Sequence, residues 1–323
     1  MPTFLGSLRR LVLAPSLADV SFDGRGFPGP RTPDTPALEA IPQAVVCGFE
    51  WGIDARGVGE VERRLRLVEP AMRGFAVEGA TMAFTVLDAM SGGVRTRDLL
   101  RGEGAPHLFL AYIGIGFAMA RLPRVLWRRV LPDLAGTSPY HPTMSWLAVD
   151  GYGFDLAYFR TRHWVGGQRV PAAYAWQGDS GYFPRAADQG VGRALWFVHG
   201  ARVDDVADAV ERFPERRRGD LWSGVGLAAA FAGGGTAEAT SALRRRAGGY
   251  RAELGLGAVF AASARNLADH VPEHTARVVE GLAGLTVPEA VRLAESTSTH
   301  TSDGDVPPYE VWRGRIRHAL GGS

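Results

Sequence analysis

Lysine is absent from this 323-residue sequence, and cysteine occurs only once, at Cys47. A single cysteine excludes an intrachain disulfide and disfavours a structural zinc site built on cysteine. Arginine therefore supplies the basic side chains, and the 36 basic residues are nearly balanced by 34 acidic ones. The arginines alternate with acids, as in residues 60–64 and 211–218, so we predict no segregated basic face and no nucleic-acid binding.

Long apolar runs are missing as well. The longest uncharged apolar stretch, residues 108–120, is too short to span a bilayer and is rich in glycine, which favours a buried core helix. The first fifteen residues contain two arginines, but their apolar stretch is too short for a secretory signal. These absences predict a cytoplasmic protein, and a partner could bring it to a membrane.

Helical periodicity dominates from about Ala37 onward. Val61, Leu65 and Val68 recur at the spacing of one apolar helix face, and glycine-broken apolar helices follow. Strand signals are weak and are confined to two candidates, Trp164–Ala173 and Ala194–His199. We therefore predict a mostly α fold.

An internal repeat is suggested when the sequence is laid over itself. At an offset of 145 residues, Val61, Leu65, Val68, Gly79, Met82 and Ala83 fall on Val206, Val210, Phe213, Gly224, Leu227 and Ala228. At shorter offsets, residues 114–118 match residues 257–261, and residues 149–151 match residues 279–281. Chance similarity of alanine-rich helices is the alternative. The conserved order of the three blocks instead favours two tandem, diverged helical repeats packed with pseudo-two-fold symmetry.

The pattern predicts five segments along the chain. They are an extended N-terminal arm (1–36), helical repeat one (37–162), a connecting segment or lid (163–185), helical repeat two (186–295) and a C-terminal tail (296–323). The connecting segment includes Tyr174, Trp176 and Tyr182 and could form a small β-hairpin. The tail ends in a short basic helix, Tyr309 to Leu320, and we expect the two repeats to form one compact unit.

Standard catalytic and cofactor motifs are absent. The sequence has no phosphate-binding loop, no nucleophile elbow and no zinc helix with paired histidines. Gly114-Ile115-Gly116 lacks the third glycine of a dinucleotide fingerprint, and Pro272 interrupts the helical spacing of His270 and His274. We therefore predict no cofactor and no metal.

Two acids lie inside apolar helical segments. Glu78 and Asp150 are each flanked by glycine and apolar residues, and burying a carboxylate there requires a partner. A structural ion pair with an arginine, for which Arg193 is the natural candidate, is one interpretation. The other is a desolvated carboxyl group with a raised pKa, placed for proton transfer.

The second half of the chain offers different chemistry at the matching positions. Glu78 falls on Ser223, and Asp150 falls on Glu280. Such a difference suits two repeats of which one carries the functional groups and the other has a supporting, structural role. Ser223 lacks a histidine in any familiar arrangement, so we expect a packing serine. Asp188 and Asp220 are placed as helix N-caps.

Aromatic residues gather in two stretches of sequence. One stretch contains Tyr152, Phe154, Tyr158 and Phe159, and the other contains Trp196, Phe197 and Trp222. Core packing is one interpretation of both. Small residues beside these rings would alternatively leave a slot for a flat, conjugated ligand.

Several long segments together carry a family resemblance. They are Leu5-Gly6-Ser7-Leu8-Arg9-Arg10, Arg73 to Ala80, Trp146 to Phe159, Asp188 to Phe197 and Asp220 to Phe231. They resemble domain-of-unknown-function family 1702, the UnbL-type proteins encoded beside enediyne polyketide synthases. The resemblance implies an accessory role in converting the linear conjugated polyene made by the synthase into the enediyne core. In many relatives we expect a histidine where this chain has Asp155.

The sequence and this resemblance together support specific site hypotheses. For an enzyme, the catalytic candidates are Glu78, Asp150 and Arg193, and the substrate-binding candidates are Tyr152, Phe154, Asp155, Tyr158, Trp196, Trp222 and Ser223. Oxidation would need an oxidant from elsewhere, because no redox cofactor motif is present. The alternatives are a carrier or scaffold that shields the polyene, and a helical adaptor. The expected partners are the polyene or an enediyne intermediate and other accessory proteins, a membrane-bound one among the candidates.

Overall fold

The computed structural model describes residues 16–321, and these form helices and loops without any strand. The α-helices are α2 (Phe22–Arg25), α3 (Thr35–Asp54), α4 (Val58–Leu65), α5 (Pro70–Ser91), α6 (Arg95–Arg101), α7 (Leu108–Arg121), α8 (Leu147–Phe159), α9 (Phe183–Val198), α10 (Val203–Glu211), α11 (Glu215–Ala232), α12 (Ala237–Ala247), α13 (Arg251–Leu267), α14 (Glu273–Ala283), α15 (Val287–Thr297) and α16 (Pro308–Gly321). The mostly α prediction is confirmed. The segment Leu5 to Arg10 lies outside the described residues.

Both strand candidates are wrong. Ala194–His199 belongs to the end of α9, because a short apolar run fits a buried helix as well as a strand. Trp164–Ala173 begins in the single π-helical turn η5 (Arg162–Gly166) and continues as irregular chain. The proposed hairpin reduces to one isolated bridge between Trp176 and Asp179.

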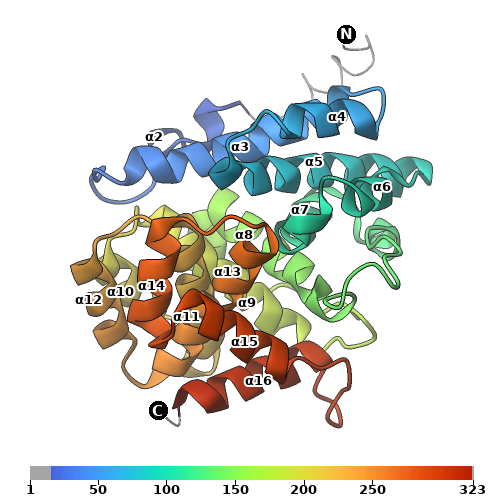
Figure 1. Ribbon diagram of the computed structural model, residues 1–323. Coiled ribbons are helices and arrows are strands. Elements are labelled where there is room, and N and C mark those ends of the chain that lie inside the picture. Colours follow the sequence, from blue (N-terminus) through green and yellow to red (C-terminus); the bar gives the residue numbers. More distant parts are fainter. Residues whose placement is uncertain (1–15, 322–323) are drawn as a thin grey trace. The chain divides into compact units, whose positions relative to one another are not determined.

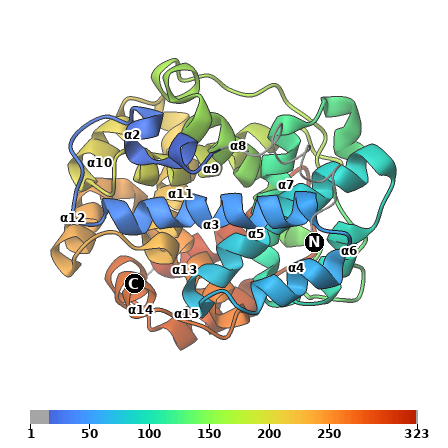
Figure 2. The ribbon, with the colours of Figure 1, turned by 90° about the horizontal axis from the view of Figure 1, so that it is seen from above.

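The chain divides into two units. Unit 1 contains residues 39–152 and, within the described residues, 16–26, whereas unit 2 contains residues 27–38 and 153–321. In unit 1, α5 lies between α3 and α7, and Figure 1 and Figure 2 both show α3 running along α5. Residues 74–86 of α5 are all buried, which fits a helix with neighbours on more than one side.

Glycine sets the spacing of these helices. A Cβ atom added to Gly79 would lie 1.9 Å from the carbonyl oxygen of Val45 in α3, and one added to Gly114 in α7 would lie 2.1 Å from the carbonyl oxygen of Glu78. Real Cβ atoms essentially never approach so closely, so the main chains of neighbouring helices touch directly. Gly116 makes the same kind of contact with α8, where a Cβ would lie 2.1 Å from the carbonyl oxygen of Ala148.

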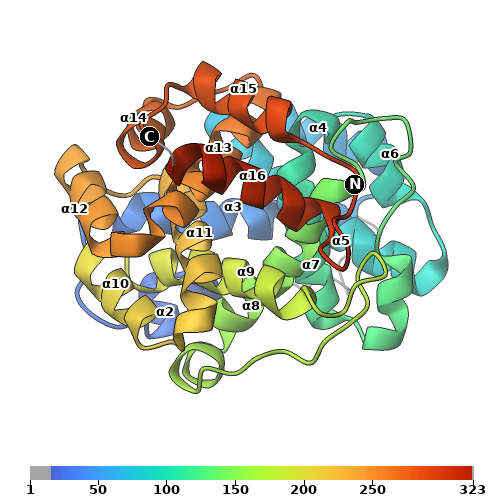
Figure 3. The same cartoon turned by 90° about the horizontal axis from the view of Figure 1, so that it is seen from below.

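Unit 2 uses the same device around α11. A Cβ atom on Gly224 would lie 1.9 Å from the carbonyl oxygen of Gln189 in α9, and one on Gly257 in α13 would lie 2.1 Å from that of Ser223. The C-terminal helix α16 packs against α13 and α15, as Figure 3 shows. Its Arg313 is fully buried, so this end of the chain contributes to the core of the unit.

Each unit also contains an arginine that binds the end of a short helix. In unit 1, the Arg73 guanidinium donates to the carbonyl oxygens of Val68 and Arg66, just after α4. In unit 2, the Arg218 guanidinium donates to the carbonyl oxygens of Phe213, at 2.8 Å, and Glu211, at 2.6 Å, at the end of α10. These bonds satisfy carbonyl groups that a helix end leaves without an internal partner.

Among the described residues, no helix combines the length and apolar character needed to cross a membrane.

Candidate functional site

The two acids predicted as proton-transfer groups lie in unit 1 and are buried. Glu78 in α5 is 4% exposed, and Asp150 in the first turn of α8 is 1% exposed. Both helices contact α7 through glycine, at Gly114 beside Glu78 and at Gly116 beside Ala148. The fold therefore places the two acids on the two helices that contact α7.

Four of the aromatic residues noted in the sequence lie together within unit 2, where Phe27 joins them. We define the aromatic cluster as Phe27, Phe154, Tyr158, Phe159 and Phe197. The Phe154 ring stacks on Tyr158, with centroids 5.4 Å apart, and meets Phe197 edge to face at 5.6 Å. Phe27 and Phe159 each contact Tyr158 edge to face, at 5.0 and 5.2 Å.

Arg193 joins this cluster from α9. Its guanidinium carbon lies 4.9 Å from the centroid of the Phe154 ring, within the range of a cation–π contact. Phe154, Phe159 and Arg193 are half-buried, whereas Tyr158 and the neighbouring Asp155 are buried. The cluster thus has a buried base and a partly accessible edge that carries a positive charge.

Four predicted binding residues lie elsewhere. Tyr152 belongs to unit 1, where its ring meets Trp127 edge to face at 5.0 Å. Trp196 donates its indole hydrogen to the carbonyl oxygen of Gly233 at 2.8 Å and lines a cavity of about 10 Å³, the size of one water molecule. Trp222 and Ser223 are each 1% exposed, deep within α11.

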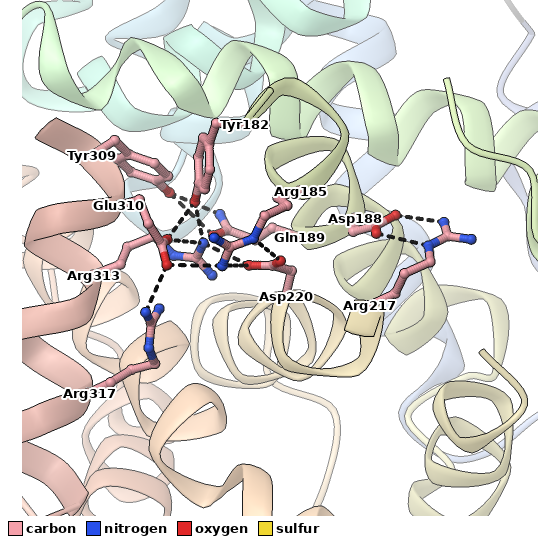
Figure 4. A network of polar contacts seen from close by, with 10 residues as sticks. All are labelled: Tyr182, Arg185, Asp188, Gln189, Arg217, Asp220, Tyr309, Glu310, Arg313 and Arg317. Atoms are coloured by element: carbon pink, nitrogen blue, oxygen red, sulfur yellow. Dashed lines mark hydrogen bonds and ion pairs between the residues drawn. The ribbon is translucent and has the colours of Figure 1, made fainter. Parts of the chain in front are cut away.

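A larger polar network, not predicted from the sequence, fixes α16 within unit 2. At its centre, Arg313 Nη1 donates to Asp220 Oδ1 at 2.8 Å and to Glu310 Oε2 at 2.9 Å. The same nitrogen contacts the Tyr182 hydroxyl, which donates to Glu310 Oε2 at 2.8 Å. Figure 4 shows these side chains converging from α16, from α11 and from the start of α9.

Two more arginines close the network from its outer side. Arg185 donates to Asp220 Oδ2 and to Glu310 Oε1, both at 2.9 Å, and Arg317 donates to Glu310 Oε1 at 2.8 Å. Three guanidinium groups therefore face two carboxylates. The arrangement binds α16 to α9 and α11 through charge-assisted hydrogen bonds, which are stronger than neutral ones.

The network fixes the protonation states of its members. Burial alone would raise the pKa of Glu310, but the guanidinium groups of Arg313, Arg317 and Arg185 lower it to about 2. Burial also raises the pKa of Tyr182 well above its ordinary value, so this phenol stays neutral and donates its hydrogen. Glu310 is thus a permanent anion that accepts hydrogen bonds at any pH near neutrality.

Asp188 and Asp220 do not cap helices. Asp188 lies inside α9 and accepts two hydrogen bonds from Arg217, at 2.6 and 2.9 Å, with both side chains about 5% exposed. Asp220 lies inside α11, where Arg185 and Arg313 bind it. The N-cap predictions were wrong because each helix begins five residues earlier, and the arginine partners come from distant parts of the sequence.

Among the described residues, no three histidine, cysteine or acidic side chains are placed together to hold a metal ion. The network residues that the sequence analysis missed are Tyr182, Arg185, Glu310, Arg313 and Arg317, and it also missed Arg217, the partner of Asp188. One signal was available, because Glu310 and Arg313 stand at i,i+3 spacing beside Tyr309 and Trp312 in the segment predicted as a short basic helix.

The fold and its buried charges define an all-helical protein whose core helices touch through glycine. The chain belongs to the family described as "Protein of unknown function (DUF1702)", which matches residues 4–320. Neither the curated proteins nor the solved structures include a significant match. The prediction that the chain belongs to domain-of-unknown-function family 1702 is therefore confirmed over nearly the whole chain.

Proposed function

We propose that this protein acts in enediyne biosynthesis, as an accessory protein that works on the linear conjugated polyene from the iterative polyketide synthase. Support for the pathway comes from the resemblance of its long motifs, such as Trp146 to Phe159, to the UnbL-type proteins of enediyne gene clusters. Membership of the matching family across residues 4–320 is consistent with that resemblance.

The aromatic cluster is the observation that carries the proposal. A conjugated polyene is flat and polarisable, and aromatic rings bind such surfaces by stacking at centroid distances of about 4.5–7 Å. Phe154 and Phe159 are half-buried residues, and the Tyr158 ring stacks on Phe154. Arg193 over Phe154 adds a cation that interacts favourably with π-electrons of the rings and of the ligand.

Catalysis would rest on Glu78 and Asp150. Both are buried carboxyl groups in helices that contact α7, and a positioned carboxyl group can act as a general acid or base. Proton transfer between carbons of the conjugated system needs no oxidant, and it is the reaction class that we assign to these acids. If neither acid takes part, the protein would act as a carrier that shields the polyene.

The two units are, in this proposal, diverged copies of one helical module. Gly79 and Gly224, which are 145 residues apart, each touch a carbonyl oxygen of the preceding core helix. Arg73 and Arg218 stand at the same offset and bind carbonyl groups at positions that also differ by 145 residues. Equivalent positions with different side chains, such as Glu78 and Ser223, would allow the copies to take different roles.

Polyene binding is tested first. The purified protein is titrated with the cognate linear polyene, and the shift of the polyene absorbance bands measures binding. Phe154→Leu removes the ring of a half-buried residue of the aromatic cluster and should weaken binding about fivefold. The matched control is Trp196→Phe, because this ring lies against Gly233 and outside the cluster. Unchanged affinity in the Phe154 variant would refute the assignment of the cluster.

Chemistry is tested by following the polyene bands over time, alone and with each accessory protein. Turnover that is lost in Glu78→Gln or Asp150→Asn, but kept in a control Glu103→Gln variant, would assign the enzyme. All variants are first compared by circular dichroism and thermal unfolding. Binding without a change in the polyene would assign the carrier, and the absence of binding would refute both and leave the adaptor.

A further inference from the structure

A group of exposed arginines lies on the segment that follows α7. We define the arginine patch as Arg121, Arg124, Val125, Arg128 and Arg129, which include most of the short helix η3 (Arg124–Arg129). We propose that this patch binds the surface of an anionic lipid bilayer.

The patch comes from a basic stretch of the sequence, unlike the mixed sequence at residues 211–218. Residues 104–132 contain four arginines and no acidic residue, and all four arginines are exposed. The alternation of arginines with acids at residues 60–64 and 211–218 therefore does not extend to this segment. The negative surface potential of a bilayer with anionic lipids attracts exposed arginines. This potential falls off within a Debye length, which is about 8 Å at physiological salt.

A buried tryptophan holds the patch in place. Trp127 is 3% exposed, and its indole donates to the carbonyl oxygens of Met119 at 3.0 Å and Leu122 at 3.3 Å. Val130 is also buried, so η3 is attached to unit 1 at its middle and just after its end. The Arg124 guanidinium carbon lies 4.8 Å from the Trp127 ring, which keeps this charge beside the helix. The exposed side chains are thus displayed on a fixed support.

An exposed apolar side chain within the patch favours a lipid partner. Val125 is 67% exposed and stands between Arg124 and Arg128. Arginines around an exposed apolar residue suit the boundary between headgroups and acyl chains, where both kinds of side chain are stabilised. A surface for single-stranded nucleic acid would instead use exposed aromatic rings for stacking, and Trp127, the aromatic residue of η3, is buried.

This inference goes beyond the proposed function and does not depend on it. A hydrocarbon polyene partitions into bilayers, so a protein that works on one would gain access to it by binding there. The binding assay itself contains no polyene. A protein that binds vesicles but not the polyene, or the reverse, would separate the two proposals.

The test is sedimentation of the full-length protein with sucrose-loaded vesicles. One set contains phosphatidylglycerol and phosphatidylcholine, and the other contains phosphatidylcholine alone. We expect binding to the anionic set that weakens as salt is raised. The double variant Arg128→Gln/Arg129→Gln should bind about 25-fold more weakly, at roughly fivefold per arginine. Val125→Asp should also weaken binding.

The matched control is Arg244→Gln/Arg245→Gln, an exposed arginine pair at the end of α12. It removes the same charge from unit 2 and should leave vesicle binding within twofold of the wild type. An equal loss in this control would overturn the proposal, as would equal binding to neutral vesicles. Binding to duplex DNA that depends on Arg128 and Arg129, without vesicle binding, would overturn it and assign the patch to nucleic acid.

Discussion

Glu310 should make the stability of the protein depend on pH in the acidic range. Its pKa in the folded protein is about 2, because Arg313, Arg317 and Arg185 stabilise the carboxylate against the cost of burial. In the unfolded chain the pKa returns to about 4.3. A group whose folded pKa is lowered stabilises the fold above its unfolded pKa, and this contribution is lost as the pH falls through the folded pKa.

The difference of roughly two units corresponds to about 3 kcal/mol at neutral pH. Between about pH 5.5 and pH 3, this single carboxyl group should therefore remove about 2 kcal/mol from the free energy of unfolding. Glutamine resembles the protonated acid in shape and charge. Glu310→Gln should thus be less stable than the wild type by about 3 kcal/mol near neutrality and by only about 1 kcal/mol near pH 3.

The assay is urea denaturation, followed by circular dichroism at a series of pH values from about 5.5 to 3. The control is Glu295→Gln, which neutralises an exposed glutamate on α15 and should keep the full pH dependence of the wild type. Parallel pH curves for the wild type and Glu310→Gln would refute the reasoning, because they would show that the network does not hold Glu310 ionised.

Two further changes test the packing and the second buried ion pair. Gly224→Ala would place a Cβ atom 1.9 Å from a carbonyl oxygen of α9, so the helices must separate. We expect a loss of about 3 kcal/mol in urea denaturation, and no loss for Gly249→Ala, which has nothing within 4 Å. Asp188→Asn should cost about 3–5 kcal/mol, because it leaves the buried Arg217 guanidinium without its carboxylate. Asp208→Asn, at an exposed pair, should cost less than about 1 kcal/mol in the same assay, and equal losses would contradict the burial argument.

The helical class could be predicted from the sequence because the spacing of apolar residues is a local property. Val61 and Leu65, predicted on one helix face, are both completely buried in α4. The glycine-rich apolar stretch 108–120 also indicated a buried core helix, and residues 108–119 are all buried in α7. Local periodicity could not separate a buried helix from a strand at Ala194–His199, because the run is short.

The polar network could not be predicted, because its members come from distant parts of the sequence. Arg313 binds Asp220, which lies 93 residues earlier, and Arg185 binds Glu310, which lies 125 residues later. Composition shows that many arginines and acids exist but not which of them meet. An acid flanked by glycine, such as Asp220, was therefore assigned the commonest local role of a helix cap.

Contact between main chains has a consequence for how this scaffold can change. Where Gly114 meets the carbonyl group of Glu78, the spacing of α5 and α7 is set by backbone atoms and not by the side chain of residue 78. The identity of that side chain can then vary while the two helices keep their separation. A lineage, or a protein engineer, could exchange the reactive groups carried by α5 without having to rebuild the framework that supports them.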